Sequence, residues 1–501
     1  MAGHSSPGGD SASEPKQLRK NSLGTAAISF LVISAAAPLT GIAGAFPIAI
    51  LQGNGSGLPF DFVLITILLL IFAVGYCRMA SRITHAGSFF AFVSKGLGGV
   101  AGSSAALVCL LAYNGLQIGL YGLFGAATAG TVASLTGLDL PWYLWSLAAA
   151  GLIGLMGFRR IEFSARLLTV LVVVEFLVIL ILDALILLHG GDRGLGLSSF
   201  SLASLGQGVP VISIVVCFSC FMGFEAATIY SEEAKHPSQT VKRATLVSIL
   251  LIGGFFTLTA WLVVEGIGSA NLVSLVGSLA NADGSPAPET MIYALSDRYG
   301  GASLTLAISL LFVTSIFAAM QAFHNVIARY FFALGREGLL FSSLGQTHPR
   351  YQSPHLGSLL QSLLTGVTVG VFALVQIDPV LGLFNWLATL GTLGLIVVMA
   401  AVSLSIAVYF GRQREVPRKT VQTLIFPVLA AVLLLGIAGL LTANFSVLIG
   451  LAPDDPLYRH SYAMPLLIPV VGLIGLVVGL RQRGSSPIRA DRGDGAGDRL
   501  R

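Results

Sequence analysis

Long apolar runs separated by short polar segments alternate along most of the chain. A run of about 18 or more apolar residues is long enough for a helix to cross a bilayer. The pattern predicts twelve such spans, at 24–50, 61–78, 98–133, 141–157, 166–188, 209–231, 241–264, 302–330, 356–376, 381–409, 423–445 and 463–480. The fold class predicted is therefore an all-α membrane protein, in which the long third span must tilt strongly or project beyond the bilayer.

Two of these spans contain helix-breaking residues near their middle. In the first span Pro38 is followed by Gly41 and Gly44, and in the sixth Gly223 lies beside Glu225. The two spans occupy equivalent positions if five helices form one repeat and the next five form an inverted copy. Matched broken helices indicate a transporter's binding site at the bilayer midplane, whereas a single break would be typical of an ordinary kink.

The composition supports the membrane class. Of the 501 residues, 55% are hydrophobic and only 10% are charged, whereas soluble domains carry about a quarter charged residues. Nothing resembles a metal motif, a phosphate-binding loop or a catalytic cluster, so we expect no enzyme activity, cofactor or metal. Basic residues are not interleaved with aromatic residues in any long run, which argues against a nucleic-acid partner.

The basic residues also predict the orientation. With the N-terminus inside, only Arg193, Arg298 and Arg459 of the 28 Lys and Arg fall on the outer side. This asymmetry predicts a multi-pass protein of the cell inner (plasma) membrane with both termini cytoplasmic. The predicted organisation is a disordered tail at 1–21, a transporter core at 22–410, two further spans at 411–480 and a disordered tail at 481–501.

Four stretches resemble permeases of the amino acid–polyamine–organocation superfamily. They are the loop 78–98, the segment 221–225 with 232–237, the segment 329–338 with Pro354, and residues 384–386. Their order and spacing cover the chain from about 24 to 410. The resemblance implies two inverted five-helix repeats with broken helices 1 and 6, two peripheral helices, and alternating access around a site formed by spans 1, 3, 6, 8 and 10. It also implies no organic cofactor.

An unwound segment leaves backbone groups that a ligand can satisfy, with amides suited to a carboxylate and carbonyls suited to an ammonium group. An amino acid zwitterion matches both. The predicted substrate-binding residues are Thr40, Gly41, Ile42, Ala43 and Gly44 in span 1, and Phe218, Ser219, Cys220, Phe221 and Gly223 in span 6. Asn114, Gln117 and Tyr121 in span 3 are further candidates, and Gly115 and Gly119 form a helix-packing motif.

Ionisable residues inside spans are candidates for a function in coupling or gating. Glu175 occupies a place where several relatives carry a lysine that replaces a sodium ion, and its carboxyl group could load and release a proton. Glu225 is either a structural acid of the broken helix or part of a gate, and Asp183 is predicted to be interfacial.

Three functions remain open. The first is an amino acid transporter coupled to protons. The second is a polyamine or other organocation exchanger of the same fold, whose substrate would require more than one acid facing the cavity. The third is a non-transporting membrane receptor or enzyme, which the lack of any soluble domain disfavours.

Overall fold

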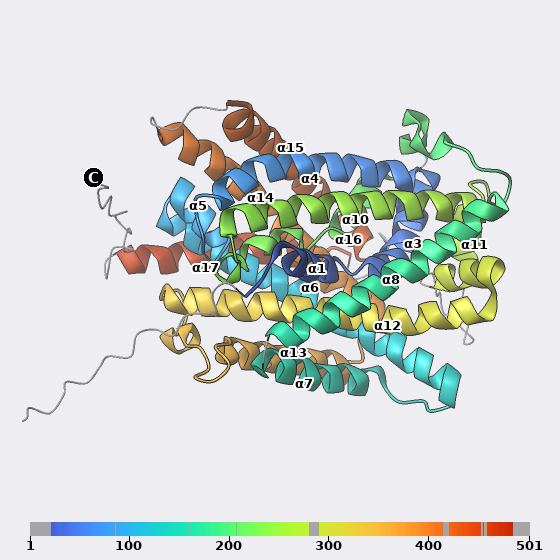
Figure 1. Ribbon diagram of the computed structural model, residues 1–501, viewed down its shortest axis with the longest axis horizontal. Helices are drawn as coiled ribbons and strands as arrows, with labels where there is room; N and C mark the ends of the chain where they lie inside the picture. Colours follow the sequence, from blue (N-terminus) through green and yellow to red (C-terminus); the bar gives the residue numbers. More distant parts are fainter. Residues whose placement is uncertain are drawn as a thin grey trace, which may run out of the picture.

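The computed structural model describes residues 22–85, 87–159, 161–206, 208–279, 290–413, 420–451, 454 and 458–483, and these are almost entirely helical (Figure 1). Within them, β-pairing is limited to one isolated bridge between Leu23 and Ala234. The predicted tail 1–21 and residues 484–501 of the other predicted tail lie outside the described residues.

The helices follow the predicted apolar runs. They are α1 Thr25–Ala36, α2 Pro38–Thr40, α3 Phe46–Ile48, α4 Leu58–Ala80, α5 Phe89–Leu97, α6 Gly99–Thr136, α7 Trp142–Arg159, α8 Ile161–His189, α9 Pro210–Ser219, α10 Pro237–Ile267, α11 Leu272–Ser278, α12 Met291–Arg336, α13 His355–Leu374, α14 Asn385–Arg412, α15 Phe426–Ala443, α16 Phe445–Leu448 and α17 Ala463–Arg483. Local signals set their ends: α4 has a proline and Asp61 in its first turn and Arg78 in its last, as the helix dipole favours.

Ten helical stretches of the described residues are long and apolar enough to cross a membrane. They are Thr25–Ala80, Gly99–Thr136, Thr169–His189, Pro210–Thr228, Pro237–Ile267, Met291–Arg336, His355–Leu374, Pro379–Arg412, Val421–Ala443 and His460–Gln482. The first is 56 residues long and includes the residues of the first two predicted spans, and Trp142–Phe158 is a shorter apolar helix at the predicted fourth span. The all-helical membrane class is confirmed, while the count of twelve and the inverted repeats stay predictions.

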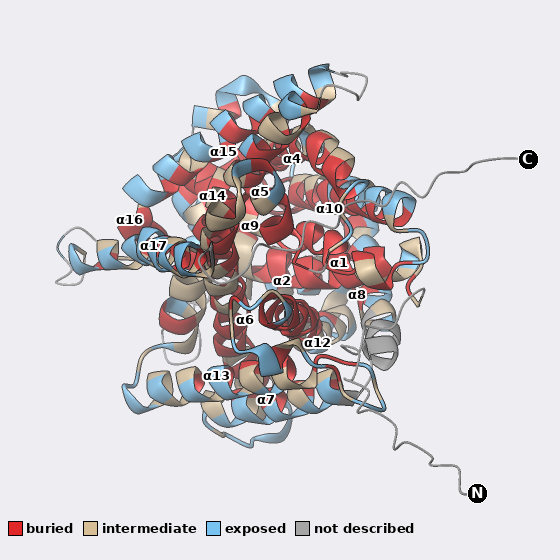
Figure 2. Ribbon diagram, turned by 90° about the vertical axis from the view of Figure 1, so that its left-hand side faces the viewer, coloured by how far each residue is buried: buried red, intermediate tan, exposed pale blue. Residues whose placement is uncertain are grey.

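The helices differ in their position within the bundle. In Figure 2, which looks along the bundle, buried residues gather on α1, α2, α6, α9 and α12, whereas α7, α13, α15 and α17 lie at the outside. The outer surface is apolar: Leu359 and Leu363 of α13 are more than 60% exposed. Exposed leucines in place of charged side chains are what contact with lipid requires.

Glycines bring the two central helices α6 and α14 into backbone contact. A Cβ atom placed on Gly115 would lie 2.8 Å from the carbonyl oxygen of Leu387, and one on Gly391 would lie 2.6 Å from that of Ala112. Real side chains do not fit at such distances, so only glycine permits this approach. The predicted packing motif at Gly115 and Gly119 therefore faces α14, where it supports one wall of the central region.

Candidate functional site: a cavity between two broken helices

The first predicted span is interrupted at Ala37. Helix α1 ends at Ala36, Ala37 adopts a left-handed conformation with φ 44° and ψ 78°, and Pro38 begins α2. Proline disfavours the helical conformation at the residue before it, which explains the position of the break. A left-handed alanine costs about 1–3 kcal/mol, so the surrounding packing must hold it. Because Pro38 has no amide hydrogen, the carbonyl of Ser34 lacks its usual i+4 donor.

The sixth predicted span is interrupted at 220–223. Helix α9 ends at Ser219, Gly223 is left-handed with φ 113°, and a 3-10 helix then covers Phe224–Thr228. The amide of Gly223 donates a hydrogen bond to Oε2 of Glu225 at 2.9 Å. Oε1 of Glu225 is buried without a hydrogen-bond partner among the described residues. The Glu225 carboxylate therefore stabilises the turn at Gly223, and Glu225 lies within the break of span 6 itself.

The two breaks lie against each other. A Cβ atom on Gly223 would lie 2.5 Å from Cβ of Ala35 in the first span. A Cβ atom on Gly41 would lie 2.8 Å from the Phe256 ring and 3.4 Å from Sγ of Cys220. Both glycines thus permit a close approach between the broken helices, and neither position can hold a larger side chain without displacing its neighbour.

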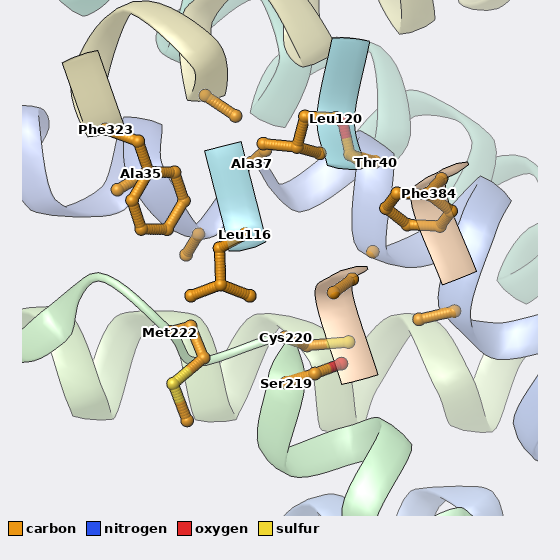
Figure 3. Close-up of a pocket in the computed structure, with 15 residues that line it drawn as sticks. Ala35, Ala37, Thr40, Leu116, Leu120, Ser219, Cys220, Met222, Phe323 and Phe384 are labelled. Atoms are coloured by element: carbon orange, nitrogen blue, oxygen red, sulfur yellow. The ribbon is translucent and has the colours of Figure 1, made fainter. Parts of the chain in front are cut away.

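A cavity of about 80 Å³ lies between the two breaks (Figure 3). One water molecule needs about 10–15 Å³, so the cavity can hold a small organic molecule. It is lined by Ala35, Ala36, Ala37, Thr40, Gly41 and Ala45 of span 1, Leu116 and Leu120 of α6, Ser219, Cys220 and Met222 of span 6, Ala319 and Phe323 of α12, and Phe384 and Ala388 of span 10. These are the five spans that the family resemblance implied around the central site.

The cavity includes part of the predicted substrate site. Thr40, Gly41, Ser219 and Cys220 line it. The other predicted residues do not belong to the lining: Ile42, Ala43, Gly44, Phe218, Phe221 and Gly223. Gly41 and Gly44 also do not break the helix, because Gly41–Ala45 continues it as a wide π-type turn. In span 6, the ring of Phe221 packs against Phe62 and Phe256 instead.

Six of the lining residues that the sequence analysis missed share a helical spacing. Leu116 and Leu120, Ala319 and Phe323, and Phe384 and Ala388 are three pairs separated by four residues. Residues at this spacing lie on the same face of a helix, so each pair marks the face that its span turns to the cavity. Because apolar residues occur on every face of a membrane helix, the spacing alone did not distinguish these pairs from lipid-facing ones. The weaker candidates Asn114, Gln117 and Tyr121 do not line the cavity.

Glu175 of α8 is fully buried beside the break of span 1. Its Oε2 accepts a hydrogen bond from the Ser315 hydroxyl of α12 at 2.8 Å, and the backbone amide of Leu39 also donates to the carboxyl group. The Ser315 oxygen in turn accepts from the amide and the hydroxyl of Thr40 at 3.3 and 3.2 Å. Oε1 of Glu175 has no hydrogen-bond partner among the described residues. One hydroxyl group therefore separates the carboxyl group of Glu175 from a cavity-lining residue.

The cavity wall itself has few polar side chains. Its polar side chains are those of Thr40, Ser219 and Cys220, and none of its lining side chains is charged. Asp183, predicted to be interfacial, is buried within the protein and accepts a hydrogen bond from Thr259 at 2.7 Å, and its depth in the membrane stays a prediction. No group of three or more His, Cys, Asp or Glu within the described part of the chain is arranged to hold a metal ion.

At the predicted outer end, Asp61 joins the two broken helices. Its carboxylate accepts hydrogen bonds from Nδ2 of Asn54, just after span 1, at 3.2 and 3.3 Å, and from the Ser213 hydroxyl of α9 at 2.5 Å. The amide of Val209 also donates to the Gly53 carbonyl at 2.9 Å. The outer halves of spans 1 and 6 are thus fastened to each other and to α4.

The predicted cytoplasmic end carries a second fastening, made of backbone hydrogen bonds. The amide of Leu23 donates to the carbonyl of Glu233 at 3.1 Å, and the amide of Lys235 donates to the carbonyl of Leu23 at 2.9 Å. These bonds join the chain entering span 1 to the chain leaving span 6.

Ion pairs connect the same region to the end of α12. The Glu233 side chain pairs with Arg329, and Glu232 pairs with Arg336. Next to them, His85 forms a hydrogen bond with Glu337 at 2.9 Å, and this contact lowers the pKa of the Glu337 carboxyl from its ordinary value of 4.5.

The comparison with known proteins identifies the family of the chain. The amino acid permease family matches residues 23–474. The chain is 24% identical to the branched-chain amino acid permease of Bacillus subtilis (strain 168) over 383 residues, which cover 73% of this chain and 76% of that protein. It is also 24% identical to the low-affinity putrescine importer of Escherichia coli (strain K12) over 360 residues, covering 70% and 73% of the two chains.

A shorter match, 25% identical over 176 residues, is to the human cationic amino acid transporter 4, covering 34% of this chain and 25% of that protein. The matched proteins are transporters and importers of small molecules rather than enzymes. Together with the many apolar helices, they establish a multi-pass transport protein of the plasma membrane. By its match over most of its length, the chain belongs to the amino acid permease family.

Proposed function

We propose that this protein is a secondary active transporter that moves an amino acid with an apolar side chain by alternating access, coupled to a proton. The single observation that carries the proposal is the apolar cavity between two broken helices, with the buried carboxyl group of Glu175 beside it. The cavity is the substrate site in this proposal, and Glu175 is the proton carrier.

The ends of the broken helices suit the charged groups of an amino acid. The last carbonyls of α1 belong to Ser34, Ala35 and Ala36, and the amides that would normally pair with the latter two donate to Glu175 and Ser315. Carbonyls at a helix C-terminus carry partial negative charge and favour an ammonium group. On the same wall, the Thr40 hydroxyl donates to Ser315 and the Ser219 hydroxyl donates to the carbonyl of Val216, and either would bind the carboxylate of the substrate by turning its hydrogen to the cavity.

The rest of the wall favours an apolar side chain. Leu116, Leu120, Met222, Phe323 and Phe384 offer hydrocarbon, sulfur and aromatic surface, and an apolar substrate side chain loses little by leaving water for it. The similarity to a branched-chain amino acid permease supports this substrate class.

A polyamine or organocation exchanger is the second candidate, supported by the similarity to a putrescine importer. A diamine needs an acidic partner for its second ammonium group, because burying an unpaired charge is costly. None of the side chains lining the cavity is acidic. An amino acid with an apolar side chain is therefore the better fit.

Proton coupling is supported by the surroundings of Glu175. Its carboxyl group is buried, its partners are neutral, and one of its oxygens has no partner among the described residues. A buried carboxylate without a cation nearby is stabilised by taking up a proton when the site becomes accessible. We assign Glu225 the structural role of fastening the turn at Gly223, together with gating at that break.

The distribution of basic residues supports an orientation with both termini in the cytoplasm, since only Arg193, Arg298 and Arg459 lie on the predicted outer side.

The substrate class and the coupling to protons are tested together with purified protein in proteoliposomes. We expect leucine to accumulate when an inward proton gradient is imposed, and putrescine to fail to compete. Accumulation of putrescine, or leucine uptake that ignores the gradient, would contradict the substrate class or the coupling, respectively.

A further inference from the structure

The Ser315 hydroxyl lies between the carboxyl group of Glu175 and Thr40, which lines the cavity. It donates to Oε2 of Glu175 at 2.8 Å and accepts from Oγ1 of Thr40 at 3.2 Å. The three side chains come from α8, α12 and span 1, and all are buried. Ser315 carries no signal in the sequence, because serines in membrane helices commonly bond to the preceding turn of their own helix.

A hydroxyl group has one hydrogen to donate, and this fixes the direction of the whole series of hydrogen bonds. While Glu175 is ionised, its carboxylate can only accept. The hydroxyl hydrogen of Ser315 then points to Glu175, and the hydroxyl hydrogen of Thr40 points to Ser315. These are the donor directions of the two hydrogen bonds in the structure. In this state the Thr40 oxygen presents only lone pairs to the cavity.

Protonation of Glu175 allows the series to reverse. The carboxyl O–H becomes a donor to Ser315, the Ser315 hydrogen turns to Thr40, and the Thr40 hydrogen becomes free to point into the cavity. The bound proton stays on Glu175, and the two hydroxyl groups only rotate about their C–O bonds. No other covalent bond forms or breaks.

Building on the coupling role proposed for Glu175, we infer that Ser315 and Thr40 relay its protonation state to the cavity as a change from hydrogen-bond acceptor to donor. The donor state of Thr40 matches the carboxylate of an amino acid. Linkage requires the reverse effect as well, so that bound substrate favours the proton on Glu175 by the same factor. Ser315 is a positioning residue in this relay, and Thr40 is the group that touches the substrate.

Several titratable groups on α8 and on the elements packed against it have partners of their own. Asp183 of α8 accepts from Thr259 of α10, and His324 of α12 forms a hydrogen bond with Ser358. At the predicted outer end, Glu265 of α10 accepts from the amide of Gly196. Helices α1 and α2 contain no titratable side chain. The charged residues Lys242, Arg243, Asp297, Arg298, Arg329 and Arg336 lie toward the ends of α10 and α12.

Equilibrium binding of leucine to the purified full-length protein, measured between pH 5 and pH 8, tests the relay. Leucine keeps the same charge across this range, so a pH dependence belongs to the protein. We expect the affinity of the wild type to rise about tenfold on acidification, within the usual range of coupling between two sites. Thr40→Val and Ser315→Ala should bind leucine with an affinity that is nearly independent of pH. Thr40→Ser keeps the hydroxyl group and should keep the pH dependence.

Thr259→Val is the matched control, because it removes a buried threonine hydroxyl from Asp183, a pair that lies outside the cavity lining. It should behave as the wild type. If Thr40→Val keeps the full pH dependence while Glu175→Gln loses it, the relay is wrong and the coupling role of Glu175 survives. A wild type that binds leucine equally at every pH overturns the relay, and one that does not bind leucine at all contradicts the proposed substrate as well.

Discussion

Arg329 and Glu233 form a buried ion pair, in which Nε donates to Oε1 at 2.5 Å and Nη2 donates to Oε2 at 3.2 Å. Their side chains are only 3% and 2% exposed. Removing one partner leaves a buried charge uncompensated, which costs about 3–5 kcal/mol. We therefore expect Glu233→Ala to lower the thermal unfolding midpoint of the purified protein sharply.

The neighbouring pair provides the control for this experiment. Arg336 and Glu232 are 29% and 19% exposed, and a pair so accessible to solvent contributes at most about 1 kcal/mol. Glu232→Ala should therefore shift the midpoint only slightly. Equal shifts for the two variants would show that burial does not set the strength of these pairs.

Gly223→Ala should impair both folding and transport. The residue has φ 113°, a conformation that costs a non-glycine residue about 1–3 kcal/mol, and the new Cβ would meet that of Ala35 at 2.5 Å. Gly254 of α10 has open space around it, so Gly254→Ala should be neutral or stabilising. Thermal stability and uptake measured on both variants check this, and a stable, active Gly223→Ala would refute it.

Glu175→Gln should uncouple transport from the proton gradient. Glutamine can still accept a hydrogen bond from Ser315 but cannot titrate. The variant is expected to exchange labelled for unlabelled leucine across the proteoliposome membrane, yet not to accumulate it when a pH gradient is imposed. If accumulation persists at the wild-type level, another group carries the proton.

Acid should weaken the contact between Glu337 and His85. The hydrogen bond from His85 lowers the pKa of Glu337 below 4.5, so the stabilisation is complete above that value and disappears as the pH falls through the folded-state pKa. The carboxylate is 27% exposed, which limits the effect to about 0.5–1 kcal/mol. Glu337→Gln should therefore be slightly less stable than the wild type at pH 7, with no difference in strong acid.

Opposite ends of the bundle should respond oppositely to a protease added outside right-side-out vesicles. A cleavage site at the C-terminus should be protected, because the distribution of basic residues predicts that this tail is cytoplasmic. The same site inserted after Arg193, on the predicted outer side, should be cut. Inverted vesicles should exchange the two results, and cleavage of the C-terminal site from outside would overturn the predicted topology.

The apolar runs were sufficient to predict the all-helical membrane class, because length and composition alone decide whether a helix can cross a bilayer, but they did not predict the short helices α5 and α11. The apolar runs could not locate the break of span 1 at Ala37, since alanine is a strong helix former. Only the following proline indicates where the helix is interrupted. Ser315 was missed for a related reason: its role depends on Glu175, which lies 140 positions away in the sequence. Thr40 and Ser219 were found because the breaks themselves mark the wall of the cavity.

The two fastenings of the broken helices have a mechanical consequence. Their outer halves are tied through Asp61, and their inner halves through the bridge between Leu23 and Ala234. Between these ties, each helix has one left-handed residue, Ala37 or Gly223, at which its direction can change. Because their ends stay joined, the two helices can bend only as a pair, and the level at which they bend is that of the cavity.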